Sequence, residues 1–160
     1  MDIEVVIALG SNLGDRRRLL DKAVVRLRQE IGEVRAVSKF CETTSLLPEH
    51  VPFAPQPDYL NGAVRLTAHC LPHALLSHLL DIEQRLGRVR RERWGPRTVD
   101  LDFIAAGKLV ICSATLALPH PEMHRRAFVL GPMLEVAPRW VHPLFQKTTE
   151  ELYNEVLEQG

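Results

Sequence analysis

The chain has 160 residues, of which 46% are apolar and 25% are charged, and its 20 basic and 20 acidic residues cancel to a formal net charge of zero. This length and composition predict one globular domain, residues 1–160, with a substantial hydrophobic core. The balanced charge does not indicate a nucleic-acid or membrane surface, and no apolar run is long enough to span a bilayer.

Two further features concern the compartment. The N-terminal stretch is acidic and then briefly apolar, unlike the basic start and longer apolar segment of a secretory signal, so we expect a cytoplasmic protein. The three cysteines, Cys41, Cys70 and Cys112, show no metal-motif spacing. We therefore expect reduced, mostly buried thiols.

The first half of the chain alternates between strand and helix patterns. A β-branched run over residues 3–9 predicts a strand, and an apolar stripe from Asp15 to Ile31 predicts a helix. Looser alternation over 34–42 predicts a second strand. Residues 45–58 contain four prolines and no regular period, which is typical of a long surface loop.

The second half adds a third strand and a second helix, and then further elements. Alternation in YLNGAVRLTA places Tyr59 and Asn61 on one face and Leu60 and Val64 on the other. The remaining predictions are a helix over 72–87, strands over 98–106 and 109–112, a short helix ending near 138, and a Thr-capped terminal helix.

This order, β-α-β-β-α-β followed by additional C-terminal elements, is that of a ferredoxin-like α+β fold. The pattern predicts an antiparallel sheet with both early helices on one face. The opposite face would then be left free for a functional site.

Two aspartates interrupt the apolar strand over 98–106. Asp100 and Asp102 are two residues apart and point to one face, whereas Val99, Leu101 and Phe103 point into the core. Like charges this close destabilise a strand unless something compensates them. Two carboxylates without nearby Cys or His suit Mg²⁺, and salt bridges to nearby arginines are the alternative.

The arginines precede the aspartates directly. Residues 85–97 contain six arginines and one acid, a run that is commonly just a solvated surface. Acidic metal ligands beside an arginine-rich loop also match phosphoryl transfer, in which arginines grip phosphate oxygens. Trp94 within this run is equally compatible with core packing and with stacking on a flat ligand.

Four segments together carry a resemblance to a known family: GSNLGD, PDYLNGAV, RERWGPRTVDLD and LPHPEMHRRAFVLGPMLEVAP. In order and spacing they resemble 6-hydroxymethyl-7,8-dihydropterin pyrophosphokinase of folate biosynthesis, over nearly the whole chain. The resemblance implies one pyrophosphokinase domain with a ferredoxin-like fold. It also implies an enzyme that moves diphosphate from ATP to the pterin hydroxymethyl oxygen and releases AMP.

The resemblance implies roles for single residues too. Asp100 and Asp102 would hold two Mg²⁺ ions, and Arg88 and Arg97 would grip the transferred phosphates. The residues implied on the ATP side are Arg90, His120 and Arg126. Those implied in the pterin pocket are Thr43, Leu46, Tyr59, Asn61, Trp94 and Phe128.

Plainer interpretations stay open for three of these residues. Phe128 lies in an apolar helix and suits the core, His120 suits a hydrogen-bonded loop, and Thr43 suits packing at a strand end.

The implied partners are ATP and the pterin, with no nucleic acid and no membrane, and we expect a monomer.

Two rival functions remain. An RNA-binding module is one, because ferredoxin-like sheets bind single strands, although the acid pair would repel phosphate without a cation. A structural domain without activity is the other, and the Asp pair with Arg97 argues against it.

Overall fold

A computed structural model of the chain describes residues 2–12, 14–43, 59–87 and 99–159. Within these ranges the elements are β1 (Ile3–Ser11), α1 (Arg16–Glu30), β2 (Gly32–Val37), β3 (Cys41–Thr43), β4 (Tyr59–Ala68), α2 (Pro72–Gly87), β5 (Asp100–Ala106), β6 (Ile111–Cys112), β7 (Ala117–Leu118), the 3₁₀ turn η1 (Met123–Arg125), α3 (Ala127–Val136) and α4 (Thr149–Gln159).

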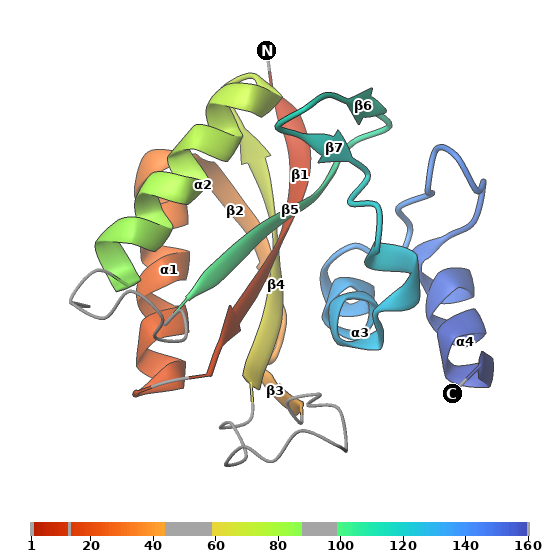
Figure 1. Ribbon diagram of the computed structural model, residues 1–160, viewed down its shortest axis with the longest axis horizontal. Coiled ribbons are helices and arrows are strands. Elements are labelled where there is room, and N and C mark those ends of the chain that lie inside the picture. The colour runs from red at the N-terminus through yellow and green to blue at the C-terminus, as the bar shows by residue number, and fades with distance from the viewer. Residues whose placement is uncertain (1, 13, 44–58, 88–98, 160) are drawn as a thin grey trace.

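The main sheet has the order β2-β4-β1-β5, with β3 also paired to β4. Every pairing in it is antiparallel. The first strand therefore lies between β4 and β5, as Figure 1 shows. This arrangement confirms the predicted ferredoxin-like α+β fold with additional C-terminal elements.

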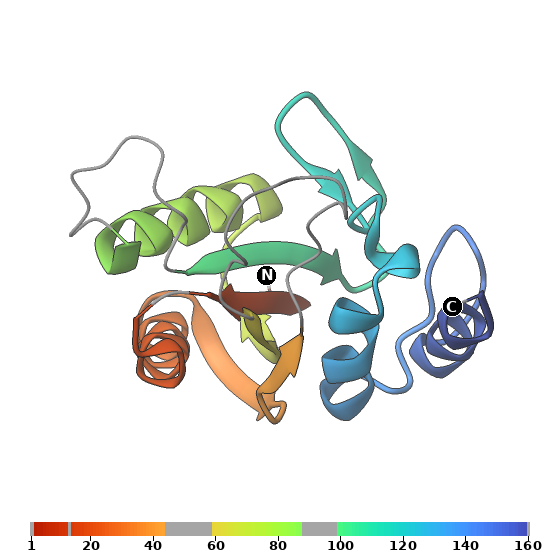
Figure 2. The same cartoon turned by 60° about the horizontal axis from the view of Figure 1, so that its bottom comes forward.

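Helices lie on both sides of this sheet. In Figures 1 and 2, α1 and α2 lie on one side, and α3 and α4 lie on the other. The core beneath α1 and α2 contains Ile7, Val64 and Phe103, one from each of the three strands β1, β4 and β5. This side matches the prediction from strand alternation.

The prediction that the other face is left free is wrong for part of that face. A second buried cluster joins Val6 and Ile104 of the sheet to Leu130 and Met133 of α3 and to Leu152 of α4. The reason is that α3 is strongly apolar and needs a partner surface, which a short helix cannot supply alone. The end of this face toward Gly10 remains open for a site.

Several strand boundaries also differ from the sequence-based prediction; the strand expected over 109–112, for example, is only Ile111–Cys112. The first strand does not stop at Leu9, because Gly10 and Ser11 still pair with Asn61 and Leu60 of β4. The segment expected as one strand over 34–42 forms β2 and β3 instead.

Between β2 and β3, the Ser38 amide still donates to the Ala63 carbonyl at 2.9 Å, and a side chain takes over the return bond. The Ser38 hydroxyl accepts a hydrogen bond from the Ala63 amide at 2.8 Å and donates one to the Lys39 carbonyl. Phe40 then packs against Gly62, where an added Cβ would lie 2.5 Å from the ring. The chain therefore leaves the strand geometry at residues 38–40 while staying packed on β4.

Side chains cap two of the helices, and the predicted Thr cap of the terminal helix is confirmed. The Asp15 carboxylate accepts from the Arg18 amide at 3.2 Å at the start of α1. At α4, Thr148 and Glu151 form a reciprocal capping box, with bonds of 3.1 and 3.2 Å.

The expectation of buried thiols is wrong, since Cys41 and Cys112 are exposed; all three cysteines are free. None of the helices in the described ranges has the length and apolar character to cross a membrane.

Candidate active site

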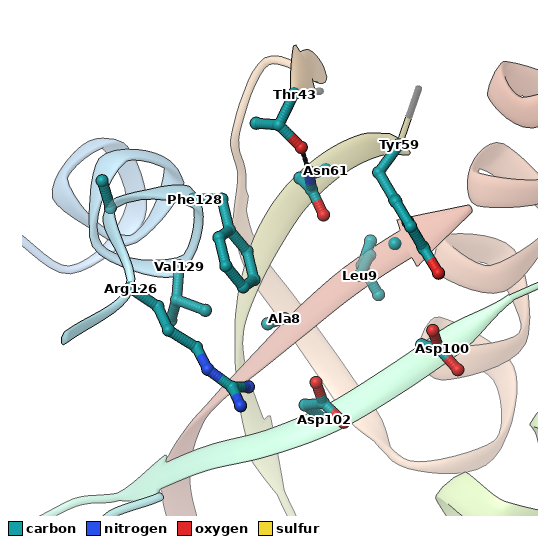
Figure 3. Close-up of a pocket in the computed structure, with 12 residues that line it drawn as sticks. Ala8, Leu9, Thr43, Tyr59, Asn61, Asp100, Asp102, Arg126, Phe128 and Val129 are labelled. Atoms are coloured by element: carbon teal, nitrogen blue, oxygen red, sulfur yellow. Dashed lines mark hydrogen bonds between the residues drawn. The ribbon is translucent and has the colours of Figure 1, made fainter. Parts of the chain in front are cut away.

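A pocket of about 630 Å³ opens on the sheet face that α3 only partly covers. Its floor is the end of β1, and its walls come from β3, β4, β5 and the start of α3. Figure 3 shows the side chains that line it. Seven of the site residues predicted from the sequence line this pocket: Thr43, Tyr59, Asn61, Asp100, Asp102, Arg126 and Phe128.

Strand register brings the polar walls together across a floor of small residues. Gly10 of β1 pairs with Asn61 on one side and with Asp100 on the other. Two residues before Gly10 on β1, Ala8 likewise pairs with Asp102 of β5. Directly opposed residues share a face, so the amide and both carboxylates project over Ala8 and Gly10.

This floor was not predicted from the sequence. A Cβ at Gly10 would lie only 3.2 Å from Asn61 Oδ1, so the glycine leaves room beside that amide. The available signal was the pair Ala8 and Gly10, which are small residues two positions apart in a β-branched strand. Their meaning depends on which strands lie beside β1, and the register alone supplies that.

The aspartates lie as strand alternation predicts. Asp100 and Asp102 are half-buried and line the pocket, whereas Val99, Leu101 and Phe103 are buried on the opposite face.

The backbone of β5 between the two aspartates is also held from the α2 side. The amide of Leu101 donates to Glu83 Oε2 at 2.7 Å. This bond fixes the strand at the point from which both carboxylates project.

The two carboxylates suit a hard cation whose coordination shell is completed by other ligands. Among the residues that the structure describes, no group of three or more His, Cys, Asp or Glu is placed to hold a metal. Mg²⁺ is commonly bound by one or two carboxylates together with waters and substrate phosphates. The acid pair therefore suits a cation that arrives with a phosphate ligand.

One arginine of the basic run faces away from the pocket. Arg85 pairs with Glu30 of α1 and with Asp81, the latter at 3.0 Å. It therefore ties α2 to α1, and any neutralisation of the aspartates by the basic run would have to come from residues 88–97.

The wall formed by β3 and β4 combines an amide, a hydroxyl and a phenol. Asn61 is 8% exposed, and its Nδ2 donates to Thr43 Oγ1 at 2.5 Å, as Figure 3 shows. Burial raises the pKa of the Tyr59 phenol, and the negative charge of Asp100 adds to this effect. Tyr59 is thus held neutral, with its hydroxyl able to donate.

Helix α3 supplies the opposite wall. Phe128 is 38% exposed and lines the pocket, so the interpretation as plain core is wrong. The Arg126 guanidinium lies 5.7 Å from the centroid of the Phe128 ring. In Figure 3 it points toward Asp102, so the described pocket carries a cation and a carboxylate that face each other.

His120 lies beside the pocket rather than among its lining residues. Burial lowers the pKa of its imidazole, while the charge of Asp102 acts in the opposite direction. Its Nδ1 accepts from the Glu122 amide at 3.2 Å, and its own amide donates to the Ile104 carbonyl at 2.8 Å. The hydrogen-bonded loop interpretation is therefore correct, and Nε2 carries the proton of the neutral ring.

Five of the predicted site residues lie outside the described residues. They are Leu46, Arg88, Arg90, Trp94 and Arg97. Their assignments stay predictions from the sequence.

The sheet is antiparallel and ferredoxin-like, and its pocket sets an acid pair opposite an amide and an aromatic ring. These features define a class of protein: an α+β domain that binds a small molecule and is suited to phosphate chemistry. Residues 6–138 match the family described as 7,8-dihydro-6-hydroxymethylpterin-pyrophosphokinase (HPPK). The chain belongs to this family.

Individual relatives agree with this assignment. The chain is 43% identical over 152 residues to the 2-amino-4-hydroxy-6-hydroxymethyldihydropteridine pyrophosphokinase of Synechocystis sp., covering 94% of this chain and 75% of that protein. The protein of the same name from Bacillus subtilis is 42% identical over 131 residues, covering 81% and 75% respectively.

Solved structures support the fold. The wild-type HPPK-DHPS of Plasmodium falciparum with SDX-DHP superposes with a TM-score of 0.78 at 13% identity, over 99% of this chain. This chain spans 45% of that longer protein. At such low identity, the likeness shows the shared fold alone.

Proposed function

We propose that this chain transfers diphosphate from ATP to 6-hydroxymethyl-7,8-dihydropterin, giving the pterin diphosphate and AMP, with Asp100 and Asp102 as its metal ligands. The observation that carries the proposal is the register across Gly10. It sets both carboxylates of β5 opposite Asn61, with Phe128 beside them, in a chain of the pyrophosphokinase family.

The pterin would lie at the Asn61 side of the pocket. Asn61 offers an amide donor and acceptor to the edge of a heterocycle, and Thr43 holds its orientation through their hydrogen bond. The exposed ring of Phe128 offers a face to a flat ligand. Leu46 and Trp94 complete the pterin pocket that we propose.

The phosphates would lie over the carboxylates. Two Mg²⁺ ions, when bound, would neutralise phosphate charge and polarise the attacking hydroxyl. Asp100 and Asp102 would hold these ions, because both project into the same end of the pocket. Arg126 faces this end, and we place His120, Arg88, Arg90 and Arg97 around the triphosphate.

Catalysis by this site would come mainly from positioning and charge neutralisation. The hydroxymethyl oxygen would attack the β-phosphorus of ATP in line, and its proton would be released to solvent. The bond from the β-phosphorus to the bridging oxygen of AMP breaks at the same centre. Tyr59 and Asn61 would orient the nucleophile from β4, and the carboxylates of β5 would hold the ions that bind the phosphate.

The decisive assay measures AMP release from Mg²⁺-ATP in the presence of 6-hydroxymethyl-7,8-dihydropterin. AMP in equal amount to the pterin diphosphate is expected. Release of ADP would identify an ordinary kinase and contradict the proposal. Salt-dependent RNA binding without Mg²⁺, together with no AMP, would favour the RNA-binding rival instead. A monomeric state and a cytoplasmic location stay predictions.

A further inference from the structure

The orientation of α3 decides where two of the site residues lie. Arg126 at its N-cap and Phe128 in its first turn both line the pocket. The N-cap makes no side-chain hydrogen bond. The inner side of the helix packs on the sheet through apolar residues such as Leu130 and Met133. Apolar burial is non-directional, so it does not by itself set the angle of the helix.

Directional contacts are found at the opposite end of α3. Arg65 of β4 donates through Nε to the Val136 carbonyl at 2.7 Å and through Nη1 to Glu4 Oε1 at 2.8 Å. The last carbonyls of a helix lack partners within the helix, and a cation near them is favourable. The neighbouring Glu135 accepts from the Lys39 amide at 3.1 Å. The C-terminal end is therefore fixed to the sheet.

The same strand carries both this anchor and a pocket residue. Arg65 and Asn61 are four positions apart on β4, so both project from the face that holds the pocket. The ten residues of α3 span about 15 Å, so a small rotation at Val136 moves Phe128 at the far end.

We propose, on the basis of the function proposed above, that Arg65 is a positioning residue for the pterin. By holding the C-terminal end of α3, it keeps Phe128 and Arg126 directed at the ligands held by Asn61 and the carboxylates. Arg65 contacts no substrate in this arrangement and acts only through the helix.

The test begins with Arg65→Met, which keeps an apolar stem and removes both donors. The KM for the pterin should rise about tenfold, the loss expected from one charge-assisted hydrogen bond, while kcat at saturation stays within about twofold. Arg65→Lys keeps the charge without the forked geometry, so it should restore only part of the lost affinity. Amide exchange over residues 127–136 should quicken in Arg65→Met.

Two matched controls separate the helix anchor from general effects. Arg35 bonds to Thr67 Oγ1 of β4 at 3.0 Å and pairs with Glu33, and neither of these partners belongs to α3. Arg35→Met should leave the KM for the pterin within about twofold. Glu4→Gln removes the ion pair but leaves the bond from Arg65 to Val136, and it should have equally little effect.

The outcomes are distinct. Wild-type KM in Arg65→Met despite faster exchange in α3 overturns the proposal, and so does an equal rise in KM in Arg35→Met. If Arg65→Met does not fold, Arg65→Lys carries the same comparison. A wild-type chain that releases no AMP and binds no pterin would instead contradict the proposed function, while the exchange data would still report whether Arg65 anchors α3.

Discussion

The two faces of the sheet are built from the same strands but are closed differently. Beneath α1 and α2, alternate residues such as Ile7, Val64 and Leu101 form an apolar core. On the other face, α3 and α4 cover Val6 and Ile104 but not the end near Gly10. One face therefore serves stability along its length, and the other combines a smaller core with a pocket.

The largest effect is expected from the uncovered end of the second face. Asp102→Asn and Asp100→Asn should each lower kcat by roughly 100- to 1000-fold, because each removes a charge that holds the phosphate-bound cation. AMP release measures this loss, and the melting temperature should not fall. Asp21→Asn, an exposed change on α1, is the control. Near-normal turnover in either pocket variant would refute the metal assignment.

The closed face should respond in stability rather than in activity. Leu79→Ala removes a fully buried side chain of α2 and should lower the free energy of unfolding by about 2–5 kcal/mol. Chemical denaturation measures the change. Activity per folded molecule should stay close to wild type. A loss of kcat in the folded fraction would show that the two faces are coupled more tightly than their separate clusters indicate.

A smaller effect is expected at the floor between the two walls. Gly10→Ala places a methyl group 3.2 Å from Asn61 Oδ1, so the amide must shift. The KM for the pterin should rise about tenfold, as expected for one added methyl group in a binding site, with the KM for ATP less affected. Steady-state kinetics in both substrates would show this. Equal changes in both KM values would place the floor outside the pterin site.

The smallest effect is expected in how the stability of the fold depends on pH. Burial holds the pKa of His120 below its ordinary value, so the unfolded chain binds a proton there more readily than the folded chain does. The stability linked to His120 is thus present above pH 6.5 and decreases as the pH falls below it. His120→Gln should reduce the drop in melting temperature between pH 7 and 5.5. An unchanged drop would show that His120 is not the group responsible.

The local patterns in the sequence predicted much of the first face. Periodicity located α1 and α2, and alternation in VDLDF separated Asp100 and Asp102 from Leu101. Such predictions succeed because they depend on one element at a time. The prediction of one strand over 34–42 was wrong, because the Ser38 hydroxyl accepts the Ala63 amide that a backbone carbonyl would accept in a continuous strand.

The sequence predicted which residues line the candidate site better than it predicted how the strands and helices hold them in place. Tyr59 and Asn61 lie where alternation placed them, and Phe128 lines the pocket as the family resemblance implied. The floor at Gly10 and the anchor at Arg65 were missed. Both act on residues of other strands or helices, which no local pattern reveals.

By itself, the sequence determined which elements form, which face of β5 carries the acid pair, and to which family the chain belongs. These properties follow from spacing along one strand or helix and from short motifs. Only the tertiary structure decided that α3 covers part of the second face, that Gly10 lies between Asn61 and Asp100, and that Arg65 reaches Val136. The physical reason is that each of these depends on register and packing between segments distant in the chain.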